Sequence, residues 1–371
     1  MPVQRCVVGY ETCVDGRGEH ERYTRGRLAQ RIAALLRCEH AGEYDPRRRY
    51  PEPPYFVPSH TVVGLAAARA LGIHGEHDLF GGVVPYRFVG TKSITHPLVD
   101  AAAHVPTGWS HAFPARVSDV VLHGVSAFAL DDARRAGARM LRLAGEVRIK
   151  PGTGIGGRNQ AVVTTARELD RALAALPAAE LGECGVVLEE NLREVATYSV
   201  GQVRIGELCA SYVGTQRLTR DNHGDEVYGG SDLVVARGGF DALLAHELDR
   251  PARIAIEQAR TYDTAARDLF PGLLASRSNY DIAAGTTSGG RRTSGVLEQS
   301  WRVGGASSAE LAALEVLAAD PARDLVRASC VECYGRLDAA AAPPRATVYF
   351  AGVDPVVGPL LKYALAGGRD A

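Results

Sequence analysis

Hydrophobic and polar positions follow two periods along the chain, one typical of strands and one typical of helices. Short apolar runs predict strands, and apolar residues that recur every three or four positions predict helices. The strands are expected at residues 4–10, 118–122, 185–188, 196–205, 207–213, 279–283, 295–298 and 347–351. The helices are expected at residues 26–36, 61–71, 127–143, 166–176, 251–270, 308–317 and 358–364. Because helices and strands are interspersed, the pattern predicts the α/β (α+β) class.

Two segments follow neither period and are expected to be loops. Residues 42–58 are rich in Pro, Arg and Tyr, which is typical of irregular structure. Residues 220–231 carry Asp, Asn and Gly, and they are numerous enough to form a lid or a binding loop.

A glycine-rich stretch at residues 147–165 has the pattern strand, loop, strand. An apolar run leads into Lys150, and a second run rich in β-branched residues follows at 161–165. Glycine backbone can approach an anion because it has no Cβ, and a neighbouring lysine adds a charge suited to phosphate. The stretch predicts a hairpin flap over a nucleotide, and the alternative is a flexible hairpin with an ordinary surface lysine. The glycines are Gly152, Gly154, Gly156 and Gly157.

Two other phosphate-binding loops fit this stretch less well. Three of the glycines match G-x-G-x-x-G, but that motif requires a helix to begin at the loop, and β-branched residues follow here. The predicted helix begins only at residue 166, with Thr164 or Thr165 as its cap. A Walker loop places its lysine after the glycines, whereas Lys150 precedes them.

Four carboxylates stand at chemically informative positions. Glu189 and Glu190 follow a buried strand, and such a strand exit is where backbone groups can bind a purine edge. Asp281 and Glu298 lie within apolar runs, where an isolated carboxylate is costly unless it is paired or binds a cation. On adjacent antiparallel strands they can share one ion, and oxygen ligands of this kind suit Mg²⁺. Taken singly, each is more often a strand-end cap or a salt-bridge partner.

Composition narrows the class of protein. The chain has 371 residues, 46% of them hydrophobic and 23% charged, as expected for a soluble globular protein with two or three subdomains. Its 42 basic and 43 acidic residues leave a formal charge of −1, so no nucleic-acid surface is expected. We see no signal peptide and no apolar run that suits a membrane span. The seven scattered cysteines fit reduced thiols, so a cytoplasmic location is expected.

The order and spacing of these features resemble the ATP-grasp superfamily, the fold of D-alanine–D-alanine ligase, biotin carboxylase and related carboxylate–amine ligases. The resemblance covers residues 91–317. Lys92, in Gly-Thr-Lys-Ser, matches the first phosphate-contacting lysine of that family, and Lys150 matches the second. Residues 152–159 resemble its glycine-rich flap. The flanking segments resemble a family of uncharacterised bacterial proteins placed in this superfamily.

The resemblance also implies roles for residues after the flap. Residues 188–192, Leu-Glu-Glu-Asn-Leu, resemble the segment that holds adenine, which assigns Glu189, Glu190 and Leu192 to the nucleotide. Asp281 and Glu298 resemble the two metal carboxylates, and Arg302 matches an arginine that stabilises the transferring phosphoryl group or the acylphosphate. Arg302 and Lys150 are thus the catalytic candidates.

Two positions depart from the family pattern. The third metal ligand is usually Asn, and Ser300 stands there, which puts binding of two metal ions in doubt. The ribose-contacting Glu is replaced by Thr197, so Glu194, three residues earlier, is the candidate for that contact.

The resemblance implies an N-terminal α/β subdomain followed by two α+β subdomains that clamp ATP. The expected units are an N-terminal domain at 1–90, a central subdomain with the flap at 91–188, a subdomain with the metal site at 189–317, and a C-terminal extension at 318–371.

The implied reaction uses ATP and Mg²⁺. A carboxylate is activated as an acylphosphate and joined to an amine or another nucleophile, and ADP and phosphate are released. The expected partners are small-molecule carboxylate and amine substrates, and analogy leaves a homodimer open. One alternative is a kinase-like or carboxylase-like enzyme of the same fold. The other is a nucleotide-binding protein that has lost catalysis.

Overall fold

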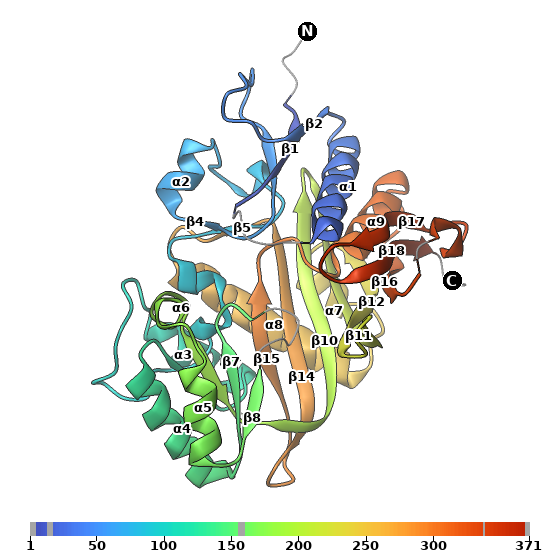
Figure 1. Cartoon of the computed structure of the whole chain (residues 1–371). Coiled ribbons are helices and arrows are strands. Elements are labelled where there is room, and N and C mark those ends of the chain that lie inside the picture. Colours follow the sequence, from blue (N-terminus) through green and yellow to red (C-terminus); the bar gives the residue numbers. More distant parts are fainter. Residues whose placement is uncertain (1–4, 13–17, 155–159, 337, 368–371) are drawn as a thin grey trace.

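The computed structural model describes residues 5–12, 18–154, 160–336 and 338–367, and their strands form four sheets (Figure 1). In the first sheet β1 (Val7–Tyr10) lies between β2 (His40–Glu43) and β3 (Tyr55–Pro58), all parallel, and α1 (Glu19–Leu35) packs beside it. A second small sheet joins β4 (Val62–Val63), β5 (Gly82–Val84) and β13 (Leu274–Ala275), next to α2 (Leu65–Ala70). Through β13, a segment from late in the chain therefore pairs with a sheet formed near the N-terminus.

Several predictions for the N-terminal third are wrong in detail. The segment 42–58, predicted as a loop, contains the fully buried strand β3, whose short apolar run is hidden between prolines. The helix predicted at 61–71 shares that range with β4, and α2 begins only at Leu65. The strand predicted at 118–122 is a 3₁₀ turn. Such turns lie at Glu76–Asp78, Arg87–Gly90, Lys92–Ile94, Ser118–Val120 and Ala339–Ala341.

The third sheet is antiparallel and has the order β6-β9-β7-β8. Strands β7 (Val147–Pro151) and β8 (Ala161–Val163) form the predicted hairpin, and Thr165 caps the helix that follows, with its hydroxyl accepting from Glu168 N. Those predictions are confirmed. The remaining elements are β6 (Gly124–Ala127), β9 (Val186–Glu189), α3 (Ala112–Val117), α4 (Leu130–Ala144), α5 (Ala166–Ala174) and α6 (Ala178–Cys184).

Gly137 allows α4 and α5 to pack closely. The sequence places this glycine within an apolar helical stripe, where it weakens the helix. A Cβ at this position would lie 2.6 Å from Leu169 Cδ1, on α5, and 3.1 Å from Leu188 Cδ2, on β9. The lower helix propensity therefore accompanies a tighter contact between the two helices and the sheet.

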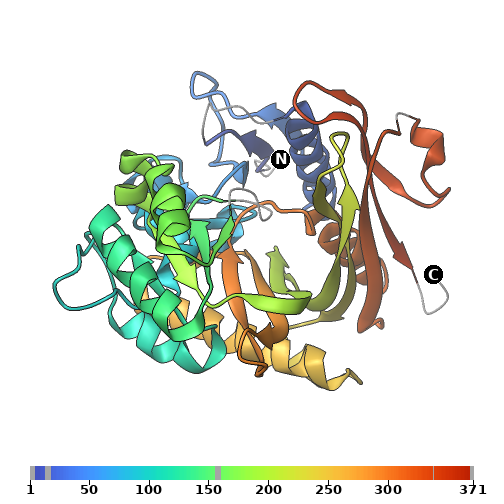
Figure 2. The ribbon, with the colours of Figure 1, turned by 60° about the horizontal axis from the view of Figure 1, so that its bottom comes forward.

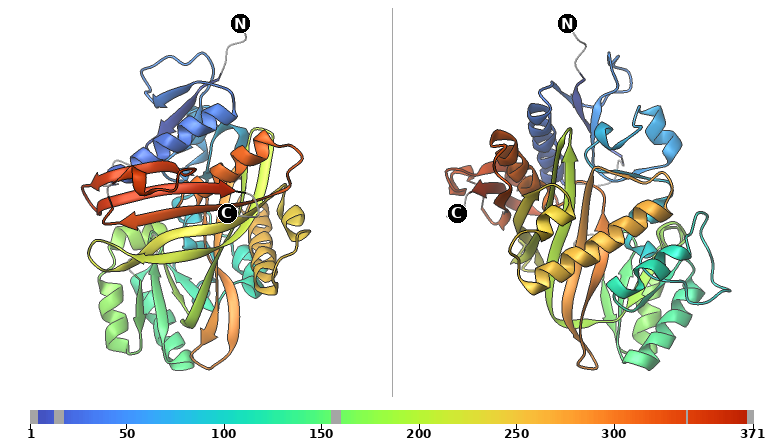
Figure 3. Two further views of the ribbon diagram at one scale, coloured as in Figure 1. Left: turned by 90° about the vertical axis from the view of Figure 1, so that its right-hand side faces the viewer. Right: turned by 180° about the vertical axis from the view of Figure 1, so that it is seen from behind.

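The fourth sheet is the largest, with the strand order β15-β14-β10-β11-β12-β16-β18-β17 and antiparallel pairing throughout. Helix α8 (Arg250–Leu269) packs across one face of it, as the right-hand view of Figure 3 shows. The segment 220–231, predicted as a long loop, is mostly hairpin, since β11 runs to Arg220 and β12 starts at Glu226. The other bounds are β10 (Leu192–Ile205), β11 (Leu208–Arg220), β12 (Glu226–Arg237), β14 (Arg277–Thr287), β15 (Arg292–Ser300) and α7 (Phe240–Leu244).

Residues after 317, expected to be an extension, contribute three strands to this same sheet. They are β16 (Leu325–Tyr334), β17 (Thr347–Asp354) and β18 (Gly358–Gly367). The helix predicted at 358–364 is wrong, because that stretch is β18, paired on both sides. A short apolar run does not distinguish strand from helix. The division into four units remains a prediction.

Helix α9 (Ser307–Ala319) joins the two ends of the chain. It packs against β16, β18 and α1, and the buried side chains of α1, α9 and the large sheet form one core. Figure 2 shows the third sheet and its helices beside one edge of the large sheet, near β14 and β15, and the C-terminal strands at its opposite edge. Within the described ranges, no helix is long and apolar enough to cross a membrane.

Candidate functional site

A cavity of about 670 Å³ opens where the third sheet, the large sheet and α1 meet. A volume of this size suits a small-molecule ligand. Its walls come from α1, β7, β9, β10, β11, β12, β14, β15, β16 and β18 and from the loops between them. Of the predicted site residues, those that line it are Lys150, Glu189, Glu190, Leu192, Asp281, Glu298, Ser300 and Arg302.

Lys150 and Glu189 form a buried ion pair on adjacent strands of the third sheet. His96 Nε2 donates to the other carboxylate oxygen of Glu189 at 3.2 Å. Burial lowers the pKa of Lys150 in spite of the neighbouring carboxylate. Burial also raises the pKa of Glu189, but the charge of Lys150 and the bond from His96 outweigh it and bring that pKa to about 2. The cavity wall thus holds a lysine whose charge is neutralised by one carboxylate.

Lys92, the other predicted lysine, is paired with a carboxylate in the same way. Its Nζ lies 2.5 Å from Glu298 Oε2 and donates to the carbonyl oxygen of Gly154 at 2.7 Å. Burial raises the pKa of Glu298, yet Lys92 and then Lys150 lower it overall. Lys92 itself is 3% exposed and lies directly behind Glu298, which lines the cavity. The resemblance assigned both lysines to one site; in the structure Lys150 lines the cavity, and Lys92 contacts Glu298 in its wall.

An apolar wall covers another part of the cavity. Leu122, Leu192, Ala283 and Leu297 pack together as a small cluster, and each of them lines the cavity. These residues come from the loop before β6 and from strands β10, β14 and β15. Such a wall suits the face of a flat aromatic ring. Leu192 thus lies where the sequence placed a purine contact.

Asp281 and Glu298 are paired residues on antiparallel strands β14 and β15. Asp281 Oδ1 accepts from Gln216 Nε2 at 2.8 Å and from Ser199 Oγ at 3.3 Å. Burial and the neighbouring charge of Glu298 raise the pKa of Asp281 to about 6. Both residues are partly buried, and a divalent cation between their carboxylates would relieve the repulsion, so the pair fits Mg²⁺. The described residues contain no cluster of three or more His, Cys, Asp or Glu that suits a metal.

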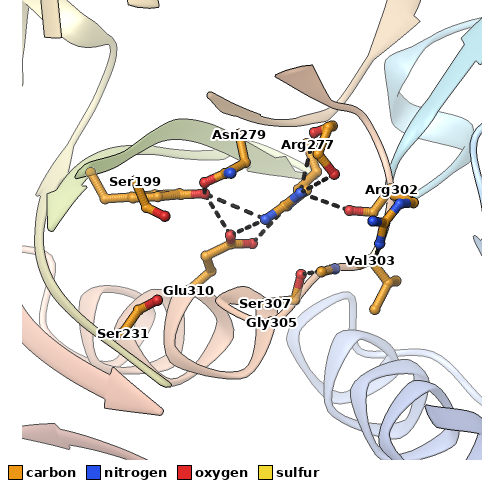
Figure 4. A network of polar contacts seen from close by, with 12 residues as sticks. Ser199, Ser231, Arg277, Asn279, Arg302, Val303, Gly305, Ser307 and Glu310 are labelled. Carbon is orange, nitrogen blue, oxygen red and sulfur yellow. Dashed lines mark hydrogen bonds and ion pairs between the residues drawn. The ribbon is translucent and has the colours of Figure 1, made fainter. Parts of the chain in front are cut away.

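Arg277 is held in a polar network beside this pair (Figure 4). Its guanidinium forms a buried ion pair with Glu310, at 2.6 Å from Nη2 to Oε1 and 3.1 Å from Nε to Oε2. Nη1 donates to the carbonyl oxygen of Arg302 at 2.7 Å, which fixes the backbone that carries the predicted catalytic arginine. The Arg302 side chain donates to Val303 O at 2.9 Å and lines the cavity.

Other predicted residues have different surroundings. The backbone N–H groups of Gly152 and Gly154 donate to Gly185 O and Pro151 O, and neither glycine lines the cavity. Gly156 and Gly157 lie outside the described residues. Glu194 is exposed, has a φ of 51° and is absent from the cavity wall, where Thr197 lies instead. The Glu190 carboxylate lines the cavity but is engaged by Arg291 and by His123 N.

Sequence reasoning missed one signal that marks the cavity. Only three of the 42 basic residues are lysines, and they are Lys92, Lys150 and Lys362. Lys362 lines the same cavity and forms a 2.7 Å ion pair with Glu332, its cross-strand partner. In a chain whose surface cations are almost all arginine, a lysine indicates a place where a compact charge is required. His96, Tyr212 and Asn279 gave no such signal, because their partners are distant in sequence.

A family model describes nearly the whole chain. It is a protein family of unknown function, DUF3182, and it matches residues 8–364. The chain belongs to this family. No protein with a curated description matches the sequence of this DUF3182 member.

Solved structures resemble the DUF3182 chain over nearly its whole length. A carboxyaminoimidazole ribonucleotide synthase from Aspergillus clavatus complexed with ATP is 11% identical, with a TM-score of 0.54, over 98% of this chain and 94% of that one. An N5-carboxyaminoimidazole synthetase from Staphylococcus aureus complexed with ADP is 9% identical, with a TM-score of 0.53 over the same shares. An ADP complex of an N5-carboxyaminoimidazole ribonucleotide synthetase is 13% identical, with a TM-score of 0.51, over 99% and 94%. These are ATP-grasp proteins, and the ATP-grasp fold predicted from the sequence is confirmed.

Proposed function

We propose that this protein is an ATP-dependent ligase that activates a carboxylate as an acylphosphate and joins it to an amine or another nucleophile. The observation that carries the proposal is the placement of two buried lysines beside two partly buried acidic strand residues: Lys150, Asp281 and Glu298 line one cavity, and Lys92 pairs with Glu298. Phosphoryl transfer requires mostly positioning and charge neutralisation, which these groups can supply. Three of the solved structures with this fold hold ATP or ADP, which supports the choice of nucleotide.

Different side chains of the cavity are suited to different parts of the nucleotide, to the metal ion and to the reacting groups. The apolar wall around Leu192 is suited to the adenine ring, and Lys92 and Lys150 are suited to phosphate oxygens. Each lysine is paired with a carboxylate, so binding of phosphate would exchange one anionic partner for another. Asp281 and Glu298 would hold Mg²⁺, which neutralises charge on the phosphates when bound. Arg302 would stabilise the transferring phosphoryl group or the acylphosphate.

The far end of the cavity is the place for the carboxylate and amine substrates. It is lined by His20, Glu21 and Thr24 from α1 and by Glu332, Tyr334 and Lys362 from β16 and β18. The Glu332 and Lys362 pair offers one anionic and one cationic group to a small polar ligand. These residues lie outside the segment that carries the resemblance, so the substrate is expected to be particular to this family.

Phosphate release tests the proposal directly. We expect the purified chain to release phosphate from ATP only when a suitable carboxylate and a nucleophile are both present, in a screen of each class. Glu298→Gln should lower the rate about 10²- to 10³-fold, because it removes one stabilising charge from the site. Formation of ADP that needs the carboxylate but no amine would support the kinase-like or carboxylase-like alternative, in which the phosphoryl group stays on the acceptor or no amide is formed. ATP binding without turnover in any combination would support the noncatalytic one.

A further inference from the structure

Asn279 lies close to Asp281 and to Ser300, the position where the family pattern expects a third metal ligand. It lies on β14 two residues before Asp281, so both side chains project from the same face of the strand. It is also the cross-strand partner of Ser300, and it lines the cavity. The Ser300 hydroxyl itself lies 3.4 Å from Arg277 Nη1, a cationic group, which makes it a poor position for a metal ion.

The hydroxyl of Tyr212 determines how the Asn279 amide is oriented. It lies 2.7 Å from Glu310 Oε1 and 2.9 Å from the Asn279 side chain. Glu310 is paired through both oxygens with Arg277, so it is a carboxylate that can only accept. A hydroxyl has one proton, and Tyr212 must donate it to Glu310. A reversed bond would place two acceptor oxygens face to face at 2.7 Å.

The oxygen of Tyr212 is then left to accept. In the structure Asn279 Nδ2 donates to Asp281 Oδ1 at 3.0 Å, and Asn279 Oδ1 lies 2.9 Å from the Tyr212 oxygen, where neither oxygen has a proton to share. A half-turn of the amide lets Nδ2 donate to Tyr212 and brings the amide oxygen to Asp281. A cation held by Asp281 favours this second orientation, because it attracts the amide oxygen.

Two oxygens 3.0 Å apart with no proton between them repel each other unless a cation lies against both. Neighbouring oxygen ligands of an octahedral Mg²⁺ ion lie about 2.9 Å apart, because each is 2.0–2.1 Å from the metal. The spacing between the Asn279 and Asp281 side chains therefore suits one edge of such a site. Gln216 and Ser199 hold the same Asp281 oxygen in place from the other side.

We propose that the side-chain oxygen of Asn279 is a ligand of the divalent cation, together with Asp281 and Glu298, in place of the ligand that the family pattern puts at position 300. The inference rests on the proposed function, because it concerns the cation of that site. A neutral oxygen from β14 thus replaces the neutral oxygen expected from β15.

The test measures cation binding without turnover. Thermal unfolding is followed with saturating ATP, first in EDTA and then over a series of Mn²⁺ concentrations, for the full chain. We expect Asn279→Ala to need at least about ten-fold more Mn²⁺ to reach half of the metal-dependent increase in stability. Mutation of a residue that only hydrogen bonds to a metal ligand already lowers metal affinity about 10- to 100-fold, and loss of a ligand should cost at least as much. Asn279→Asp, which keeps an oxygen, should need no more Mn²⁺ than wild type. Gln216→Ala removes a hydrogen-bond donor to the same Asp281 oxygen and is the matched control.

Four outcomes would overturn the assignment of Asn279 as a metal ligand or the proposed function. An Mn²⁺ midpoint of Asn279→Ala equal to that of wild type or of Gln216→Ala overturns the inference, since Asn279 then only hydrogen bonds. If Asn279→Ala does not fold, an Mn²⁺ midpoint of Asn279→Asp well above that of wild type overturns it as well. If ATP stabilises the wild type in EDTA and Mn²⁺ adds no further stability, the inference about Asn279 is overturned, but the proposed function is not. Wild type unaffected by ATP overturns the proposed function.

Discussion

At the scale of single residues, the site consists of charges that neutralise one another inside the protein. Lys150 and Glu189 are both buried, and their pairing with His96 leaves no unbalanced charge in that wall. When one partner of a buried ion pair is removed, the other is left as an uncompensated buried charge, which lowers the free energy of unfolding strongly. Removal of both charges lowers it far less. Stability and ligand binding can therefore be separated by mutation.

We expect Lys150→Ala to lower the free energy of unfolding by about 3–5 kcal/mol, because it leaves the Glu189 carboxylate without its cation. The double variant Lys150→Ala with Glu189→Gln should recover most of that loss. Chemical denaturation of both variants beside wild type measures the difference. Equal stability of the single and double variants would show that the pair is not coupled in this way.

Asp281 provides a pH-dependent prediction for the metal-free protein. Its pKa is raised from 3.8 to about 6 by burial and then by Glu298. The carboxyl thus contributes stability below pH 3.8, and that contribution is lost as the pH rises through 6. We expect Asp281→Asn to be more stable than wild type at about pH 8, and the difference to vanish at about pH 4. Urea unfolding in EDTA at both pH values tests this, and an asparagine variant that is less stable at high pH contradicts it.

At the scale of elements, periodicity predicted most helices and the strands around the site, including the paired strands that carry Asp281 and Glu298. It failed for β3 and β18, because runs of a few apolar residues between Pro and Gly fit either structure. The contacts of Tyr212 and Arg277 were not predictable, since each joins residues far apart in the chain. The scarcity of lysine in the sequence was the one signal that would have added Lys362 to the predicted site residues.

Gly137 offers a test of packing between α4 and α5. We expect Gly137→Ala to destabilise the protein by about 1–3 kcal/mol, because the new Cβ meets Leu169 and overpacks the contact. Gly26→Ala in α1 is the control, since nothing lies within 4 Å of its Cβ position. It should stabilise by about 0.5–1 kcal/mol through helix propensity alone. Thermal unfolding of the two variants should give shifts of opposite sign, and shifts of the same sign would contradict the close approach.

At the scale of the whole molecule, the last strands complete the sheet that carries the site. Strands β16 and β18 supply Glu332 and Lys362 to the cavity, and α9 packs β16 against α1. The start and the end of the chain therefore share a core with the ATP-grasp segment. This explains why the flanks, which gave no signature in the sequence, face the same cavity.

A chain that ends at residue 324 should not fold cooperatively. It lacks β16–β18, which leaves β12 as an unpaired edge strand, removes buried residues such as Val326 and Leu361, and exposes core residues of β12 such as Leu233. Circular dichroism during thermal unfolding, beside the full chain, tests this expectation. A sharp transition with native-like signal would show that the segment is a separable extension.

The central claim is that the cavity binds ATP between the two lysines and the two acidic strands. Its most direct test is the thermal unfolding of wild type with and without Mg²⁺ and ATP, beside the folded double variant Lys150→Ala with Glu189→Gln. Ligand at 100 times its Kd raises the apparent free energy of unfolding by about 2.7 kcal/mol. We predict a rise of that order for wild type and little or none for the double variant. No rise for wild type at millimolar ATP would contradict the assignment of this cavity to a nucleotide.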